Sequence, residues 1–444
     1  MKTFLSFILS FVFMASFAGP LFAGALDELA GQSGNRHYRM QHQKPVNVAP
    51  AAPMPRESVE SKKKHSEWLI MVYVAGVNNL GLFHEAEKNL DEMEKGLSAG
   101  QDNVRFVVEY ASMSGDNGVS FGNGTSTLLV VPDKTVGIKS QVIRTSPGAD
   151  TGNVNTLSRF IHSVKQRFTA DHTMLIIWNH GGGLKGIASD DLHGSGMSLK
   201  NLSSALKSLV SAYGKFDIIA TDACLMQMLS IAYEFKDYAD IIIGSQQPIP
   251  GPGYKYDSIA ETLSASGGHS AEDVARIVVE QYERKYFSYP VDSKYGYAYP
   301  QLSAIRTKYL PDLKNSIDSW AYLMASDRKL MRKFNNSSFV NNKKGIHFMY
   351  HLEYSRDLVR MIEIINKNRN HNDSVRVAGD GIRNFVENKL VIKNFSLSGR
   401  EHGVSVYLPF LEYDASLYEP LQFAKDSYWG TFVRNVVQNN IDSW

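Results

Sequence analysis

The feature that most constrains this chain is a series of short, mainly apolar runs separated by amphipathic segments. The runs are rich in β-branched and aromatic residues: Trp68–Val74, Val104–Tyr110, Thr125–Val131, Thr173–Trp178, Phe216–Thr221 and Ile241–Gly244. Strands that are covered by helices on both faces of a parallel sheet have this composition. We therefore expect most of these segments to be buried strands of one sheet.

The segments between these runs have apolar residues at helical spacing. The predicted helices are Leu82–Lys95, Asn155–Arg167, Leu199–Tyr213 and Ala223–Phe235. A strand–helix–strand rhythm predicts an α/β fold, with a mainly parallel sheet flanked by helices on both faces. The 43% hydrophobic and 11% aromatic content is sufficient for a packed core and excludes a wholly disordered chain or a coiled coil.

After about residue 300 the pattern becomes more helical. Helices are predicted at Asp312–Ala325 and Val375–Asn388, and a late strand at Val404–Leu408 is closed by Pro409. We divide the folded chain into an α/β domain, residues 66–300, and a helical C-terminal subdomain, residues 301–444.

The first 25 residues have the three parts of a secretory signal peptide. Lys2 precedes the apolar run Phe4–Ala18, and small residues at 23–25 offer a cleavage site. An uncleaved membrane anchor is the alternative, but the run is short for a span of about 20 residues. We expect export to the periplasm or the medium, and no membrane contact after cleavage. Residues 26–65 are predicted to be a disordered linker or propeptide.

The charge balance and the cysteine count exclude several functions. The 47 basic and 45 acidic side chains leave a formal charge of +2, too little to attract nucleic acid. Cys224 is the single cysteine, so the chain has no internal disulfide and no cysteine-based zinc site. In an oxidising compartment such a thiol is either buried and inert or retained for its chemistry.

Two predicted strands run directly into residues with catalytic chemistry. The strand Thr173–Trp178 is followed by Asn179 and then by His180 and three glycines, and the strand Phe216–Thr221 is followed by Asp222, Ala223 and Cys224. Functional groups gather beyond the carboxyl ends of parallel strands, so His180 and Cys224 are expected at one edge of the sheet. A histidine and the start of the helix Ala223–Phe235 would both lower the pKa of the thiol.

The backbone around these two residues suits acyl transfer. The N–H groups of Gly181 and Cys224 are candidate donors to a tetrahedral oxyanion. Alternatively, His180 is an ordinary loop histidine and the glycines form a turn. The HGGG sequence also occurs in serine esterases, but the Gly-x-Ser-x-Gly motif of those enzymes is absent, with 268–272 the nearest approach.

Several segments resemble the clostripain family of cysteine peptidases. They occur in the family's order: EWLIMVYVAGVNNL (67–80), IIWNHGGG (176–183), SDD (189–191), TDACLMQMLSIAYE (221–234) and GSQQPIPGPGYKYD (244–257). The resemblance implies a caspase-like fold and a dyad of His180 and Cys224. It implies an exported endopeptidase acting on protein or peptide substrates. A catalytically silent binding protein and a thiol hydrolase of other specificity are the alternatives.

The resemblance also implies cleavage after Arg or Lys. Asp222 matches the acidic residue just before the family's nucleophile, and it is the candidate substrate-binding residue; a helix cap is the alternative. The family often has a second acid where this chain has Pro252. No cofactor or metal is assigned. Asp190 and Asp191 leave calcium open, although two carboxylates are too few for a calcium site.

Overall fold

The computed structural model describes residues 64–100, 103–113, 124–289, 299–334, 354–367, 371–410 and 412–442. These residues belong to one compact unit, Ser58–Trp444. The predicted signal peptide, and the predicted linker except for its last two residues, lie outside the described residues.

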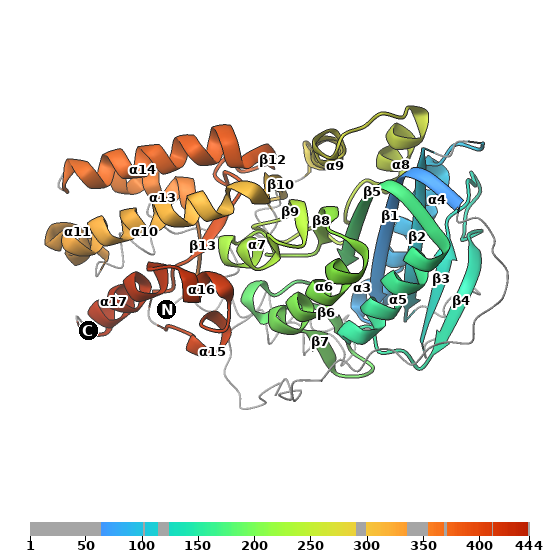
Figure 1. Ribbon diagram of the computed structural model, residues 1–444, viewed down its shortest axis with the longest axis horizontal. Helices are drawn as coiled ribbons and strands as arrows, with labels where there is room; N and C mark the ends of the chain where they lie inside the picture. Colours follow the sequence, from blue (N-terminus) through green and yellow to red (C-terminus); the bar gives the residue numbers. More distant parts are fainter. Residues whose placement is uncertain are drawn as a thin grey trace, which may run out of the picture. The chain divides into compact units, whose positions relative to one another are not determined.

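A nine-stranded sheet forms the centre of the protein, in the order β12-β10-β9-β8-β5-β1-β2-β3-β4 (Figure 1). Its strands are β1 Lys64–Gly76, β2 Val104–Ser112, β3 Gly124–Leu129, β4 Gln141–Pro147, β5 Phe168–Trp178, β8 Phe216–Asp222, β9 Ala239–Gly244, β10 Gln301–Arg306 and β12 Val391–Ser396. The five central strands, from β9 to β2, are parallel to one another. At each side two further strands are added, and each of these pairs antiparallel with its neighbours. The predicted α/β fold with a mainly parallel sheet is confirmed.

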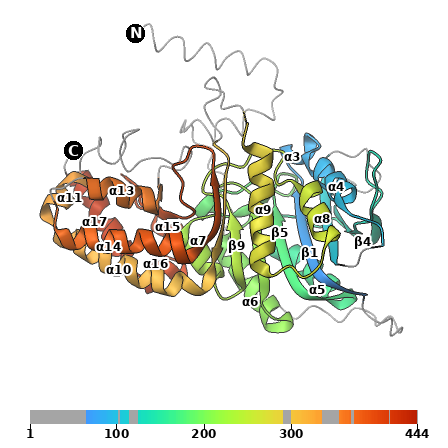
Figure 2. The ribbon, with the colours of Figure 1, turned by 90° about the horizontal axis from the view of Figure 1, so that it is seen from above.

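Helices cover both faces of the sheet because successive side chains of each strand point to opposite faces. Leu69, Met71 and Tyr73 of β1 pack on one face, and Ile70 and Val72 on the other. The first face is covered by α5 (Val154–Arg167), α6 (Leu199–Tyr213) and α7 (Leu229–Phe235). The second is covered by α4 (Glu85–Gly96), α8 (Tyr256–Ala265) and α9 (Ala271–Tyr286), as Figure 2 shows from above.

The chain after residue 300 contributes both to the sheet and to a helical layer beside it. Strands β10 and β12 complete one side of the sheet. The helices are α10 Leu310–Ser326, α11 Arg328–Phe334, α13 Leu358–Lys367, α14 Asp373–Phe385, η4 Val386–Leu390, α15 Ala415–Tyr418, α16 Gln422–Asp426 and α17 Trp429–Asp442. Their apolar residues continue the core under α7, where Trp320 stacks on Trp429. The division that we predicted at residue 300 therefore falls just before a strand of the shared sheet.

Predicted helices differ in how well their bounds agree with the structure. The helix Leu199–Tyr213 agrees at both ends. The helix predicted over Leu82–Lys95 is two helices, α3 (Asn79–Leu82) and α4, because His84 adopts a left-handed φ of 62° between them. The remaining small elements are η2 Gly183–Lys185, β6 Ile187–Asp190, β7 Ser195–Met197, η3 Thr307–Tyr309, β11 Ser355–Asp357 and β13 Ser405–Tyr407.

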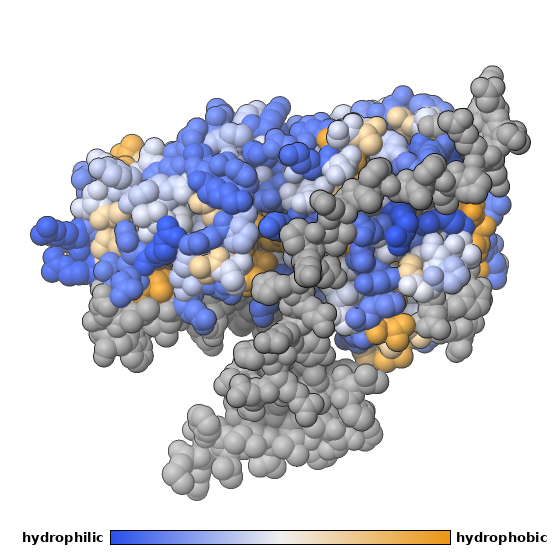
Figure 3. All heavy atoms as spheres, turned by 60° about the horizontal axis from the view of Figure 1, so that its bottom comes forward, coloured by the Kyte–Doolittle hydropathy of each residue, from blue (hydrophilic) through white to orange (hydrophobic). Residues whose placement is uncertain are grey.

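The face of the protein that Figure 3 shows is mainly hydrophilic where its side chains are described. The coloured atoms of Figure 3 are mostly blue, and hydrophobic colour forms small separate patches. Within the described residues, the helices are all too short or too polar to cross a bilayer.

Candidate active site

His180 and Cys224 follow neighbouring parallel strands at one edge of the sheet. Trp178 of β5 is paired with Asp222 of β8, and the N–H of Asn179 donates to the Asp222 carbonyl oxygen at 3.2 Å. His180 and Cys224 each come two residues after this pair. Gly181 also packs on Cys224, since a Cβ at position 181 would stand 2.1 Å from the Cys224 carbonyl oxygen. The two segments therefore meet as predicted, and the contact requires glycine.

The Cys224 thiol is partly buried and surrounded by backbone N–H groups. The Ile249 N–H donates to Sγ at 3.3 Å. Burial raises the pKa of the thiol, and this effect outweighs the hydrogen bonds from the N–H groups of Ile249, Gly181 and Cys224, which lower it. The predicted oxyanion donors, the N–H groups of Gly181 and Cys224, thus lie near enough to the thiol to lower its pKa, while the hydrogen bond to Sγ comes from Ile249.

The predicted helix at Cys224 starts later than expected. Helix α7 begins at Leu229, and residues 223–228 are not helical. Instead, this segment pairs with the loop after β9: the Leu225 N–H donates to the Gln247 carbonyl oxygen at 3.3 Å, and the Gln227 N–H to that of Ser245 at 3.0 Å. Our expectation that a helix N-terminus lowers the thiol pKa is therefore wrong. Leu225 instead adopts a left-handed φ of 66°.

A network around Asn179 holds the His180 loop. The side-chain N–H₂ of Asn179 donates to the carbonyl oxygens of Ala75 and Ser189, and its side-chain oxygen accepts from the N–H groups of His180 and Ser189. The Ala188 N–H donates to the His180 carbonyl oxygen at 3.2 Å. These bonds fix the orientation of the peptide group between His180 and Gly181. The N–H of this peptide belongs to Gly181, which packs on Cys224.

One polar side chain at this edge was not predicted from the sequence. Asn79, the first residue of α3, has its Oδ1 2.6 Å from Nε2 of His180. Asn79 lies within segment 67–80 of the resemblance, but no role was predicted for it. The available signal was an asparagine pair just after a buried strand, at the edge where functional groups gather.

Asp222 is buried at the end of β8, with 4% of its surface exposed. Its Oδ2 accepts hydrogen bonds from the Tyr254 N–H and the Tyr256 hydroxyl, both at 2.9 Å. Its Oδ1 is buried without a partner among the described residues. Burial raises the pKa of the carboxyl to about 6, although these two bonds and the charge of Lys285 lower it. The alternative role as a helix cap is wrong, because Asp222 belongs to a strand and α7 begins seven residues later.

The loop that carries Pro252 is held against Asp222. Gly253 adopts a φ of 61°, and a Cβ there would come within 2.5 Å of the Asp222 Oδ2. The ammonium of Lys285, on α9, donates to the carbonyl oxygens of Pro252 at 2.8 Å and of Tyr254 at 2.7 Å. A cation of the protein itself therefore lies beside the position where the resemblance expects a second acid.

Asp190 and Asp191 do not form a pair of ligands. Asp190 is buried, with Oδ2 accepting from the N–H and hydroxyl of Thr151 and Oδ1 accepting from the N–H and Nδ1 of His193. Asp191 is exposed. Asp150, Asp190 and His193 bring ligand atoms within 4.8 Å of one another. The Asp190 oxygens are already occupied by donors, however, and an imidazole is a poor ligand for calcium, which prefers six to eight oxygens. The group therefore does not fit a calcium site.

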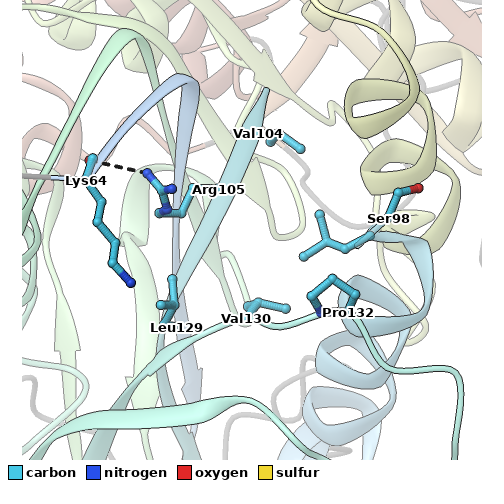
Figure 4. Close-up of a pocket in the computed structure, with 8 residues that line it drawn as sticks. Lys64, Ser98, Val104, Arg105, Leu129, Val130 and Pro132 are labelled. Carbon is cyan, nitrogen blue, oxygen red and sulfur yellow. Dashed lines mark hydrogen bonds between the residues drawn. The ribbon is translucent and has the colours of Figure 1, made fainter. Parts of the chain in front are cut away.

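A small pocket of about 140 Å³ lies at the opposite edge of the sheet (Figure 4). Its lining includes Lys64 and Val104, which begin β1 and β2, and Arg105, whose guanidinium donates to the Lys64 carbonyl oxygen at 3.3 Å. Because His180 and Cys224 follow the carboxyl ends of parallel strands, this pocket is not part of their site.

The mainly parallel sheet, with the carboxyl ends of β5 and β8 side by side, is a caspase-like fold. A family model described as the clostripain family matches residues 72–444. Clostripain from Hathewaya histolytica is 26% identical over 310 residues, which cover 59% of this chain and 57% of that protein. The chain thus matches little more than half the length of this relative. This chain belongs to the clostripain family.

Solved structures support the fold. An inactive zymogen C11 protease from Parabacteroides distasonis has a TM-score of 0.60 and 21% identity, covering 83% of this chain and 100% of that chain. A secreted C11 cysteine protease from Bacteroides thetaiotaomicron, in complex with an irreversible peptide inhibitor, has a TM-score of 0.57 and 20% identity. That match covers 85% of this chain and 100% of that chain.

Proposed function

We propose that this protein is an exported cysteine endopeptidase in which Cys224 is the nucleophile and His180 the proton carrier. The observation that carries the proposal is the position of Cys224 at a strand end next to that of His180, with Gly181 packed directly on Cys224. Membership of the clostripain family supports the same reaction.

The reaction follows from these groups. Because burial raises the thiol pKa, His180 takes the proton from Cys224 as the sulfur attacks the scissile carbonyl carbon. The developing oxyanion is stabilised by the N–H groups of Gly181 and Cys224. His180 then protonates the leaving amine, a thioester remains on Cys224, and a water molecule activated by His180 hydrolyses it.

Cleavage after Arg or Lys is the specificity that we propose. Asp222 supports this specificity. Burial of its carboxyl costs stability, and one of its oxygens has no partner among the described residues, which a cationic substrate side chain would explain. A thiol hydrolase of neutral specificity is the second candidate. It is favoured by Pro252 and by the Lys285 ammonium, which already brings a positive charge to this region.

The test uses fluorogenic peptides varied at the residue before the cut, with the full chain and the Cys224→Ala variant in reductant. Cleavage after Arg or Lys that the variant lacks supports the first candidate. Cysteine-dependent cleavage after neutral residues supports the second. Peptide binding without any cysteine-dependent cleavage would show a catalytically silent protein instead.

Export has its own test. The predicted signal peptide supports it, and the sequence of the N-terminus in protein from the periplasm or medium should begin at Leu26. Protein that keeps Met1 and remains with the membrane would contradict export by cleavage.

A further inference from the structure

Asn79 holds one nitrogen of the His180 ring. The amide oxygen Oδ1 lies 2.6 Å from Nε2. A carbonyl-type oxygen only accepts hydrogen bonds, so Nε2 carries the proton, and the lone pair of the neutral ring is on Nδ1. The contact joins the end of β1 to the end of β5, which are neighbouring strands.

The segment that carries Asn79 is fixed in place. Asn78 is fully buried, and its side-chain N–H₂ donates to the carbonyl oxygens of Ala75 at 2.9 Å and Ser189 at 3.3 Å. Its Oδ1 caps α3 by accepting from the Leu80 N–H at 3.0 Å. Gly81 closes on the strand so tightly that a Cβ there would lie 1.9 Å from the Gly76 carbonyl oxygen. Asn79 is thus preorganised by bonds that do not involve His180.

We infer that Asn79 is a positioning residue for His180, completing a Cys224–His180–Asn79 triad. It holds the ring in one tautomer, so that Nδ1 takes the proton from the thiol and delivers it to the leaving amine. Its oxygen also stabilises the imidazolium that forms in between. This inference rests on the proposed function, because it assigns a role within that reaction.

The test compares Asn79→Ala, Asn79→Asp and wild type with the best peptide substrate. We expect Asn79→Ala to lower kcat by about 100-fold with little change in KM, because a misoriented proton carrier affects the transition state rather than binding. Gln166→Ala is the matched control. It removes another amide–histidine contact, to Nε2 of His162 at 2.8 Å on the surface of α5, and should leave kcat unchanged.

The pH profile separates positioning from a merely structural role. A carboxylate at position 79 favours the imidazolium, so Asn79→Asp should retain much of the activity and move the limb of the profile that reports His180 to higher pH. A structural role would lower activity without moving this limb. Thermal unfolding of each variant shows whether it is folded.

The outcomes distinguish the two proposals. If wild type cleaves, Cys224→Ala does not, and a folded Asn79→Ala keeps wild-type kcat, the triad is refuted while the peptidase stands. An unmoved limb in Asn79→Asp also refutes the triad. If wild type shows no cleavage that depends on Cys224, the proposed function itself fails.

Discussion

The two strand ends that carry His180 and Cys224 are held by different parts of the chain. The histidine end is fixed by side chains near it in the fold, above all Asn179, which reaches Ala75 and Ser189. The cysteine end pairs through its backbone with the loop after β9. That loop is anchored by residues beyond position 300, since Gln246 donates to Asp357 and Gln247 to Glu401, both at 2.8 Å.

The two ends of the candidate site are therefore held mainly by different parts of the chain. Residues before position 190 hold most of the His180 end. The C-terminal region holds the loop that supports Cys224, and it also reaches the other end through the Tyr354 hydroxyl, which donates to the Gly182 carbonyl oxygen at 3.2 Å.

The largest effect should come from breaking the contact between the two ends. Gly181→Ala places a Cβ 2.1 Å from the Cys224 carbonyl oxygen and would displace the proposed oxyanion donor, the N–H of residue 181. We expect kcat/KM to fall by about 1,000-fold. Gly182→Ala is the control, because its φ of −115° suits any residue and its nearest contact, the Lys185 Cβ, is at 3.2 Å. Equal losses in the two variants would contradict the role of Gly181.

The second prediction tests the anchor of the cysteine end. Gln247→Ala leaves the buried Glu401 without one of its donors, which should lower the free energy of unfolding by about 2 kcal/mol and slow alkylation of Cys224. Urea denaturation and the rate of thiol labelling measure these effects. Gln422→Ala, which removes a similar pair with Asp426 on the surface, should change neither quantity.

The third prediction concerns Asp222, the buried carboxyl two residues before Cys224. The pKa of Asp222 is about 6 in the folded protein, above the ordinary 3.8, so the folded state binds more protons and its stability falls as pH rises from about 4 to 6. Asp222→Asn should therefore be more stable than wild type at pH 7.5, by about 3 kcal/mol, and no more stable below pH 4. It should also lose cleavage after Arg and Lys.

Asp273→Asn gives a control of opposite sign. A hydrogen bond from Ser270 lowers the pKa of Asp273, so its contribution is present above pH 4 and is lost on acidification. This variant should be less stable than wild type at neutral pH. A gain in both variants would mean that removal of any carboxylate stabilises the protein.

The smallest effect should come from tuning the charge of Asp222. The charge of Lys285 lowers the pKa of Asp222. When Lys285→Met removes this charge, the pKa of Asp222 should rise above 6, by less than about one pH unit. The measurement is the difference in the free energy of unfolding between Lys285→Met and the double variant Lys285→Met/Asp222→Asn, determined at a series of pH values. The midpoint of its change with pH reports the pKa of Asp222. A midpoint that moves down would contradict the electrostatic role of Lys285.

Local sequence pattern was sufficient for the parallel centre of the fold and for the meeting of His180 with Cys224. Buried strands and the helix Leu199–Tyr213 depend on periodicity that is visible within a few residues. Strands β4, β10 and β12 were missed, because β4 is largely exposed and the pairing of the other two joins distant segments. The apolar residues at 223–228 are compatible with a helix, but this segment pairs instead with the loop after β9. That pairing is not visible in the local sequence.

The anchoring of the cysteine end also sets an order in time. In a growing chain β9 has an open edge until β10 (Gln301–Arg306) has been made, and Gln247 lacks its acceptor until Glu401 has been made. An incomplete chain therefore carries both His180 and Cys224 without the support that aligns the thiol. The support of Cys224 therefore has to wait for Glu401, which is made long after Cys224 itself.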